Sequence, residues 1–157
     1  MTLPHLSFDE FERRPPDALD GDPIWNTRMF RMATYLAGRC ATDAARLGPR
    51  ISLGQADQFI RAVGSISANI AEGYSRAGPA ERLRFYAYAL GSAREALSWI
   101  DTLSDATWAP RAEYQDLLVQ IRRQLLTAIK HMRPQKYETP KGRQIRRPPT
   151  DQSQSKS

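Results

Sequence analysis

Apolar residues between positions 23 and 132 recur at intervals of three and four, which is the spacing of one face of an α-helix. Helix-breaking pairs interrupt this pattern at Gly48-Pro49, Gly78-Pro79 and Ala109-Pro110. Pro134 prevents the last segment from continuing. The pattern therefore predicts four helices, and because no segment alternates with period two for long, it predicts no sheet.

The predicted helices begin and end at suitable residues. The first runs from near Pro23 to about Leu47, the second starts after Ser52, a good N-cap residue, and Pro79 suits the first position of the third. In chain order, the four apolar stripes are Trp25, Met29, Met32, Leu36, Cys40, Ala44 and Leu47; Phe59, Val63, Ile66, Ile70 and Tyr74; Leu83, Tyr86, Leu90, Ala93, Leu97 and Ile100; and Tyr114, Leu118, Ile121, Leu125, Ile129 and Met132. Short connections between such helices predict an all-α, up-down-up-down four-helix bundle.

The third predicted helix is apolar on more than one side, since Phe85, Tyr88 and Trp99 lie away from its main stripe. A helix of this kind buries two faces, which favours a homo-oligomer with this helix in the subunit interface. The alternative is that it is simply the central helix of the monomer.

Charge divides the 157 residues into three parts. Residues 1–22 have six acidic and two basic side chains, residues 23–132 have nine and fourteen, and residues 133–157 have two and seven. We expect 1–22 to be an acidic flexible arm with Phe8 and Phe11 as candidate anchors, 23–132 to be the bundle, and 133–157 to be a basic disordered tail.

Composition narrows the class of protein. One cysteine, Cys40, excludes an intramolecular disulfide and a cysteine-rich metal site, and it suits a reducing compartment. The N-terminus lacks the pattern of a signal peptide, and no stretch approaches the roughly 20 apolar residues of a membrane span. We therefore expect a cytoplasmic protein without a membrane partner.

Two motifs carry a resemblance to a known family. Residues 65–74 read SISANIAEGY, and residues 81–85 read ERLRF, followed by ALGS at 89–92 and by Glu95. They resemble the four-helix-bundle family first noticed in intervening sequences of bacterial large-subunit ribosomal RNA genes, whose signature is roughly SIPxNIAEG, KEFxRF and AxGSxxE. Ser67 stands where that family has proline, which removes a helix kink.

The resemblance also implies an oligomeric state and binding partners. The family is related to the accessory variability determinant of diversity-generating retroelements. Its members form barrel-like homopentamers, so a ring-like homo-oligomer is expected here, with a pentamer favoured. The retroelement members bind nucleic acid and a reverse transcriptase, which makes both of them expected partners.

Polar side chains share one face of each of the two central predicted helices, namely Ser65, Asn69 and Glu72 on the second, and Glu81, Arg84, Tyr88, Ser92 and Glu95 on the third. In an antiparallel hairpin, Glu72 then faces Arg84, Asn69 faces Tyr88 and Ser65 faces Ser92. We interpret this set as a structural polar network that fixes helix register and subunit geometry.

A catalytic or metal site is the alternative interpretation of these carboxylates. Di-iron bundles need Glu-x-x-His pairs, and neither His5 nor His131 lies three residues after a Glu. Cys40 lies on an apolar stripe, and both the P-loop and the G-x-G-x-x-G motif are absent. We expect no catalytic residue, cofactor or metal, and hence no enzyme.

Basic residues on the fourth predicted helix and in the tail form the candidate nucleic-acid-binding site: Arg122, Arg123, Lys130, Arg133, Lys136, Lys141, Arg143, Arg146 and Arg147, with Tyr137 among them to stack on a base. Only four of the 23 cationic side chains are lysine, and arginine matches phosphate with two parallel hydrogen bonds. As an alternative, the basic residues form a solvated helix end and a solubilising tail, and the excess of arginine over lysine reflects codon bias.

These features predict a non-enzymatic accessory protein that binds RNA or DNA and supports, by the resemblance, a reverse transcriptase of a diversity-generating retroelement. The second hypothesis is a structural or adaptor homo-oligomer that binds another protein without nucleic acid. The acidic arm and the apolar third helix favour that alternative.

Overall fold

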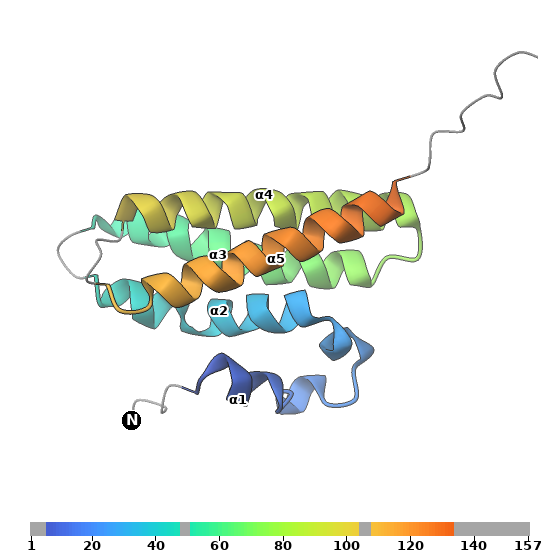
Figure 1. The fold of residues 1–157 in the computed structure, drawn as a ribbon, viewed down its shortest axis with the longest axis horizontal. Coiled ribbons are helices and arrows are strands. Elements are labelled where there is room, and N and C mark those ends of the chain that lie inside the picture. Colours follow the sequence, from blue (N-terminus) through green and yellow to red (C-terminus); the bar gives the residue numbers. More distant parts are fainter. Residues whose placement is uncertain (1–5, 48–50, 104–107, 134–157) are drawn as a thin grey trace, which may run out of the picture.

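Four long helices form an antiparallel bundle. The computed structural model describes residues 6–47, 51–103 and 108–133, and within these ranges it contains helices and no strand. The long helices are α2 (Arg28–Ala45), α3 (Leu53–Tyr74), α4 (Pro79–Leu103) and α5 (Arg111–Met132). Consecutive long helices run in opposite directions, so the start of α2, the turn between α3 and α4, and the end of α5 lie at one end (Figure 1). The predicted all-α fold is confirmed.

Local sequence signals set the helix boundaries. Ser52 caps α3, since its hydroxyl accepts a hydrogen bond from the Gln55 amide at 3.2 Å while the Gln55 side chain accepts one from the Ser52 amide at 3.0 Å. Pro79 opens α4 as predicted. The helix expected near Pro23 begins only at Arg28, because Pro23–Asn26 form a 3-10 helix, η2, capped by Asp22.

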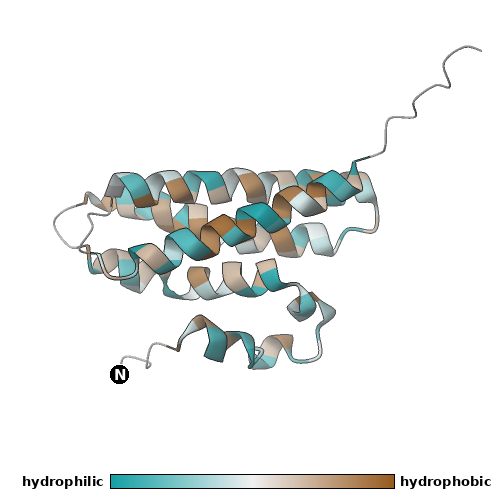
Figure 2. Cartoon of the chain, viewed as in Figure 1, coloured by the Kyte–Doolittle hydropathy of each residue, from teal (hydrophilic) through white to brown (hydrophobic). Residues whose placement is uncertain are grey.

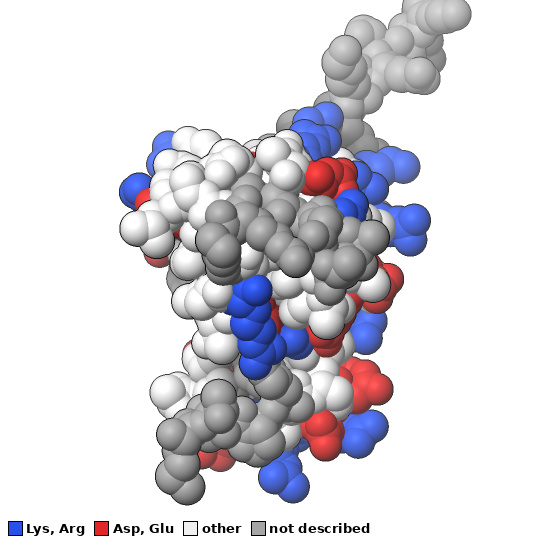
Figure 3. Space-filling model, turned by 90° about the vertical axis from the view of Figure 1, so that its left-hand side faces the viewer, with Lys and Arg blue, Asp and Glu red and all other residues white. Residues whose placement is uncertain are grey.

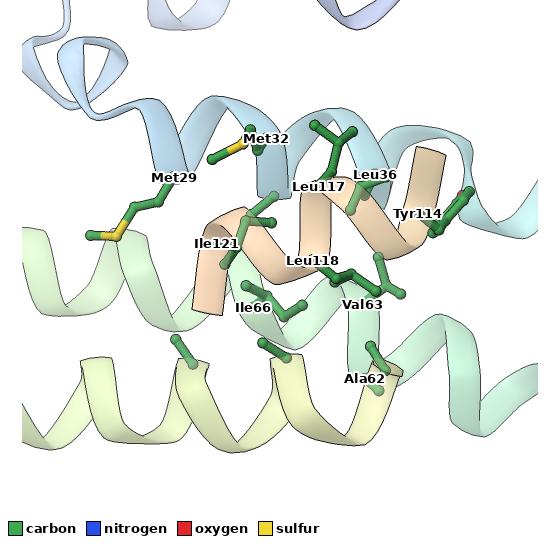
Figure 4. Close-up of a cluster of buried hydrophobic side chains, with 14 of the residues drawn as sticks. Met29, Met32, Leu36, Ala62, Val63, Ile66, Tyr114, Leu117, Leu118 and Ile121 are labelled. Carbon is green, nitrogen blue, oxygen red and sulfur yellow. The ribbon is translucent and has the colours of Figure 1, made fainter. Parts of the chain in front are cut away.

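The predicted apolar stripes meet in one core. Met32, Leu36, Val63, Ile66 and Leu118 are fully buried where α2, α3 and α5 pack together (Figure 4). Apolar residues recur as separate bands along each long helix, as an amphipathic helix requires (Figure 2). α3 passes Ser67 as a continuous helix, in keeping with the absence of the family's proline.

Helices α3 and α4 approach each other closely at Gly73. A Cβ atom at this position would lie 2.7 Å from two ring carbons of Tyr86 and 3.1 Å from Cβ of Phe85. Only glycine allows this approach, and it places the end of α3 against the first half of α4.

Replacing Gly73 with alanine is expected to lower the free energy of unfolding by about 1–3 kcal/mol, because the added methyl group overlaps the Tyr86 ring. Urea unfolding measures the change. Gly64→Ala is the matched control on the same helix, since nothing lies within 4 Å of a Cβ there, and it should be neutral or stabilising by up to about 1 kcal/mol. Equal behaviour of the two variants would contradict the close approach.

The N-terminal segment differs from the expected flexible arm. Within residues 6–22, α1 (Phe8–Glu12) begins with a capping box between Ser7 and Glu10, and η1 (Asp17–Leu19) follows it. The buried Phe8 ring packs 5.5 Å from the Tyr35 ring, and Phe11 lies 5.5 Å from Trp25 and 5.4 Å from Tyr35, all measured between ring centroids. The two predicted anchors therefore dock this segment on α2, because their rings cover apolar surface that α2 leaves open.

The outer side of α4 is partly uncovered in the single chain. Tyr88 is 51% exposed, and Phe85 and Trp99 are partly buried. The second apolar side of this helix thus lies at the margin of the bundle, where Trp99 packs against the core and Tyr88 is exposed.

Candidate nucleic-acid interface

The predicted basic residues of α5 lie on its outer side. Leu118, Ile121, Leu125 and Ile129 are buried and fix the orientation of the helix. Arg123, Lys130 and Arg133 are therefore exposed, and Arg122 is partly buried. The first part of the helix holds Glu113 and Asp116, whereas residues 117–133 contain no acidic residue. Positive charge thus increases toward the end of α5.

These cations lack carboxylate partners in the part of the chain that the structure describes. None of Arg122, Arg123, Lys130 and Arg133 forms an ion pair there, whereas Arg76 pairs with Glu72 and Arg61 with Asp57. An exposed arginine without a partner binds a phosphate without first giving up an internal contact.

A groove borders this basic surface. It has a volume of about 510 Å³ and lies between the start of α2 and the second half of α5. Its lining residues are Thr27, Arg28, Met29, Arg123, Gln124, Thr127, Ala128 and His131. The sequence did not single out Arg28, because 95 residues separate it from Arg123 and only the fold brings the two helices together.

The described residues at the opposite end of the bundle carry charges of both signs. Figure 3 looks onto that end, where Lys and Arg side chains are interspersed with Asp and Glu. The candidate interface is therefore the end of α5. The other predicted binding residues, Lys136, Tyr137, Lys141, Arg143, Arg146 and Arg147, lie outside the described residues.

The predicted polar network forms only in part. Ser92 donates a hydrogen bond to Ser65 at 3.0 Å, as expected, and so joins α3 to α4. Asn69 donates to the backbone oxygen of Ser65 at 2.8 Å and to its hydroxyl at 2.9 Å, so the expected contact of Asn69 with Tyr88 was wrong. A side chain one turn away on the same helix satisfies this amide more easily than one on the neighbouring helix.

The expected pairing of Glu72 with Arg84 was also wrong. Glu72 pairs with Arg76 on its own helix, while Arg84 lies over the rings of Phe85 and Tyr88, at 5.5 Å and 5.9 Å from their centroids. Glu72 is partly exposed and therefore needs no partner from α4. The two remaining members, Glu81 and Glu95, are exposed, and the Glu95 carboxylate lies 3.5 Å from Nε1 of Trp99.

Sequence reasoning missed a buried cluster around Asp43. The Asp43 side chain is fully buried and pairs with Arg39 at 2.6 Å and with Arg46 at 3.4 Å. The Tyr114 hydroxyl donates to Asp43 at 3.1 Å, and the Trp108 indole donates to the Asp43 backbone oxygen at 3.2 Å. The i,i+4 spacing of Arg39 and Asp43 was a visible signal, but burial of the pair was not.

This cluster links α2 to α5. Arg39 also pairs with Glu113 at 2.7 Å, and the Tyr35 hydroxyl donates to Glu113 at 2.8 Å. Burial and the hydrogen bond to Glu113 raise the pKa of Tyr35 to about 12, and burial together with the Asp43 charge raises the pKa of Tyr114. Burial also raises the pKa of the Cys40 thiol, which keeps it in the neutral form of a core residue.

Within residues 6–47, 51–103 and 108–133, no three His, Cys, Asp or Glu side chains come together as a metal site. None of the helices in these ranges has the length and apolarity needed to cross a membrane.

Comparison with known proteins gives the family. A family model described as 23S rRNA-intervening sequence protein matches residues 29–128, from the first turn of α2 almost to the end of α5. The chain belongs to this family, which confirms the resemblance seen in its motifs. No curated protein and no solved structure matches the chain.

Proposed function

We propose that this protein binds nucleic acid, with RNA preferred, and does not catalyse a reaction. The observation that carries the proposal is the outward-facing set of basic side chains on α5 and at its C-cap that have no ion-pair partner among the described residues, Arg122, Arg123, Lys130 and Arg133. The basic residues 134–157 continue this charge along the chain. The family description names 23S rRNA, which favours RNA as the first ligand to test.

Self-assembly is the second part of the proposal. Tyr88, Phe85 and Trp99 leave aromatic surface on the outer side of α4, which suits contact with a second copy. A ring of such copies, with five favoured by the resemblance, multiplies the phosphate contacts that one chain makes. The reverse transcriptase of a retroelement remains the proposed protein partner, and the cytoplasm the proposed location.

A non-catalytic role agrees with how the buried polar groups are used. Asp43 has no exposed surface, and its oxygens accept hydrogen bonds from Arg39 and Tyr114. A carboxylate held in this way stabilises the fold and is not reached by a substrate. The alternative function is an adaptor that uses the aromatic side of α4 to bind another protein, without nucleic acid.

A pair of double variants tests the role of α5. Arg123→Gln with Lys130→Gln removes two exposed cations of the interface, and Arg61→Gln with Arg94→Gln removes two exposed cations elsewhere. Each phosphate contact to a single strand contributes about 0.7 to the slope of log affinity against log salt. The first variant should therefore flatten that slope by about 1.4, while the second leaves it nearly unchanged.

Fluorescence anisotropy with a labelled oligo-uridine RNA of about 20 nucleotides gives these slopes, and thermal melting checks that both variants are folded. Equal slopes for the two double variants would mean that net charge alone attracts RNA and that α5 is not the interface.

A further inference from the structure

The groove between α2 and α5 has the chemistry of a site for one nucleotide. We propose that it holds a nucleotide unit of the bound strand, with the phosphate between Arg28 and Arg123. This inference rests on the proposed function and adds to it the place where the strand docks.

Nitrogen-bearing side chains line the groove on both walls. Arg28 comes from the start of α2, and Arg123 and His131 come from α5. Two guanidinium groups on facing walls suit a phosphate, because each presents a planar fork of N–H donors to its oxygens. This arrangement differs from a uniformly charged surface, since it places one arginine on each wall of a groove.

The rest of the lining suits the sugar and base. Gln124 and Thr127 offer polar side chains, while Met29 and Ala128 offer apolar surface. The volume of about 510 Å³ lies within the range of roughly 300–1,000 Å³ that is typical of small-molecule sites. Such a site takes an unstacked nucleotide of a single strand rather than a duplex, whose bases are paired.

An acidic side chain of the N-terminal segment already contacts the groove's arginine. A carboxylate oxygen of Glu12 lies 3.4 Å from Nε of Arg28 and 3.5 Å from Nε of Arg31. The Arg28 guanidinium also lies 5.5 Å from the centroid of the Phe8 ring and donates to Gln120 at 3.2 Å. Glu12 is thus placed to compete with a phosphate for Arg28.

Two neighbouring substitutions on α5 separate the groove from the general basic surface. Thr127 and Leu126 are adjacent and exposed, but only Thr127 lines the groove. Thr127→Glu and Leu126→Glu add the same charge to the same turn of the helix. Measured by anisotropy with oligo-uridine RNA, Thr127→Glu should bind about tenfold more weakly than Leu126→Glu, a difference of about 1.4 kcal/mol.

A third variant tests the competition by Glu12. Glu12→Gln releases Arg28 and should raise RNA affinity by up to about fivefold, the limit for an exposed ion pair. Asp9→Gln is its control, because it removes one negative charge from the same helix at a residue that does not pair with Arg28 among the described residues. Thermal melting of all four variants confirms that each one is folded.

Competition with uridine monophosphate distinguishes a strand from a free nucleotide. If the full chain binds the RNA, and the mononucleotide displaces it only weakly, the site takes a strand. If the mononucleotide binds by itself and Thr127→Glu abolishes this binding, the site takes a free nucleotide. Equal affinities of Thr127→Glu and Leu126→Glu would show that the groove is not the nucleotide site, while leaving the proposed function intact. If the unmodified chain fails to bind RNA at low salt, both proposals fall.

Discussion

Replacing Asp43 with alanine is expected to lower the free energy of unfolding by about 3–5 kcal/mol, which is the largest effect on stability that the fold predicts. The substitution removes the carboxylate that Arg39 approaches at 2.6 Å and that accepts a hydrogen bond from the Tyr114 hydroxyl at 3.1 Å. It leaves the Tyr114 hydroxyl, on a fully buried side chain, without its acceptor, and it leaves the mostly buried Arg39 with Glu113 alone.

Urea unfolding of the full chain measures this loss. Asp57→Ala is the matched control, because Asp57 forms an i,i+4 pair with Arg61 in which both side chains are more than half exposed. Removal of that pair should change the free energy of unfolding by less than about 1 kcal/mol. A loss of similar size in the two variants would show that the Asp43 cluster adds nothing beyond an ordinary surface pair.

Removing residues 133–157 is expected to weaken RNA binding more than any single substitution while leaving the bundle folded. The removed segment holds seven basic and two acidic residues. The last core residue of α5, Ile129, stays in the shortened chain, which therefore keeps its buried side chains. If the segment makes three phosphate contacts, its loss should remove the roughly 20-fold decrease in affinity that those contacts cause between about 50 and 200 mM salt.

A full-length chain with glutamine at its last seven basic positions separates charge from chain length in this experiment. It should bind as weakly as the shortened chain, and both should melt like the unmodified protein. Unchanged affinity in the shortened chain would restrict the interface to α5.

The sequence predicted the parts of the fold that depend on local periodicity. Ile66 and Leu118 lie in the core as their spacing required, and Ser52 and Pro79 open their helices. The hydrogen bond between Ser65 and Ser92 was also predictable, since an antiparallel hairpin fixes which residues face each other.

Contacts between segments that are distant in the sequence could not be predicted from it. Asp43 and Tyr114 are 71 residues apart, and nothing in the local pattern marks this aspartate as buried. Phe8 was predicted as an anchor, but α1 itself was not, because its five residues are too few for a helical periodicity to be visible. The basic residues of α5 could be predicted as part of the interface from the charge of the sequence alone. Arg28 could not, because only the packing of α2 against α5 brings it to the groove.

Nucleic-acid binding by an oligomer is tested most directly by titrating the full chain against labelled single-stranded RNA, single-stranded DNA and duplex DNA, with the particle mass measured by light scattering on the same samples. We expect a particle of several chains that binds single-stranded RNA most strongly, with an affinity that falls steeply as salt rises from about 50 to 200 mM. Absence of binding to all three nucleic acids at the lowest salt would contradict this expectation and leave the protein-binding adaptor as the function.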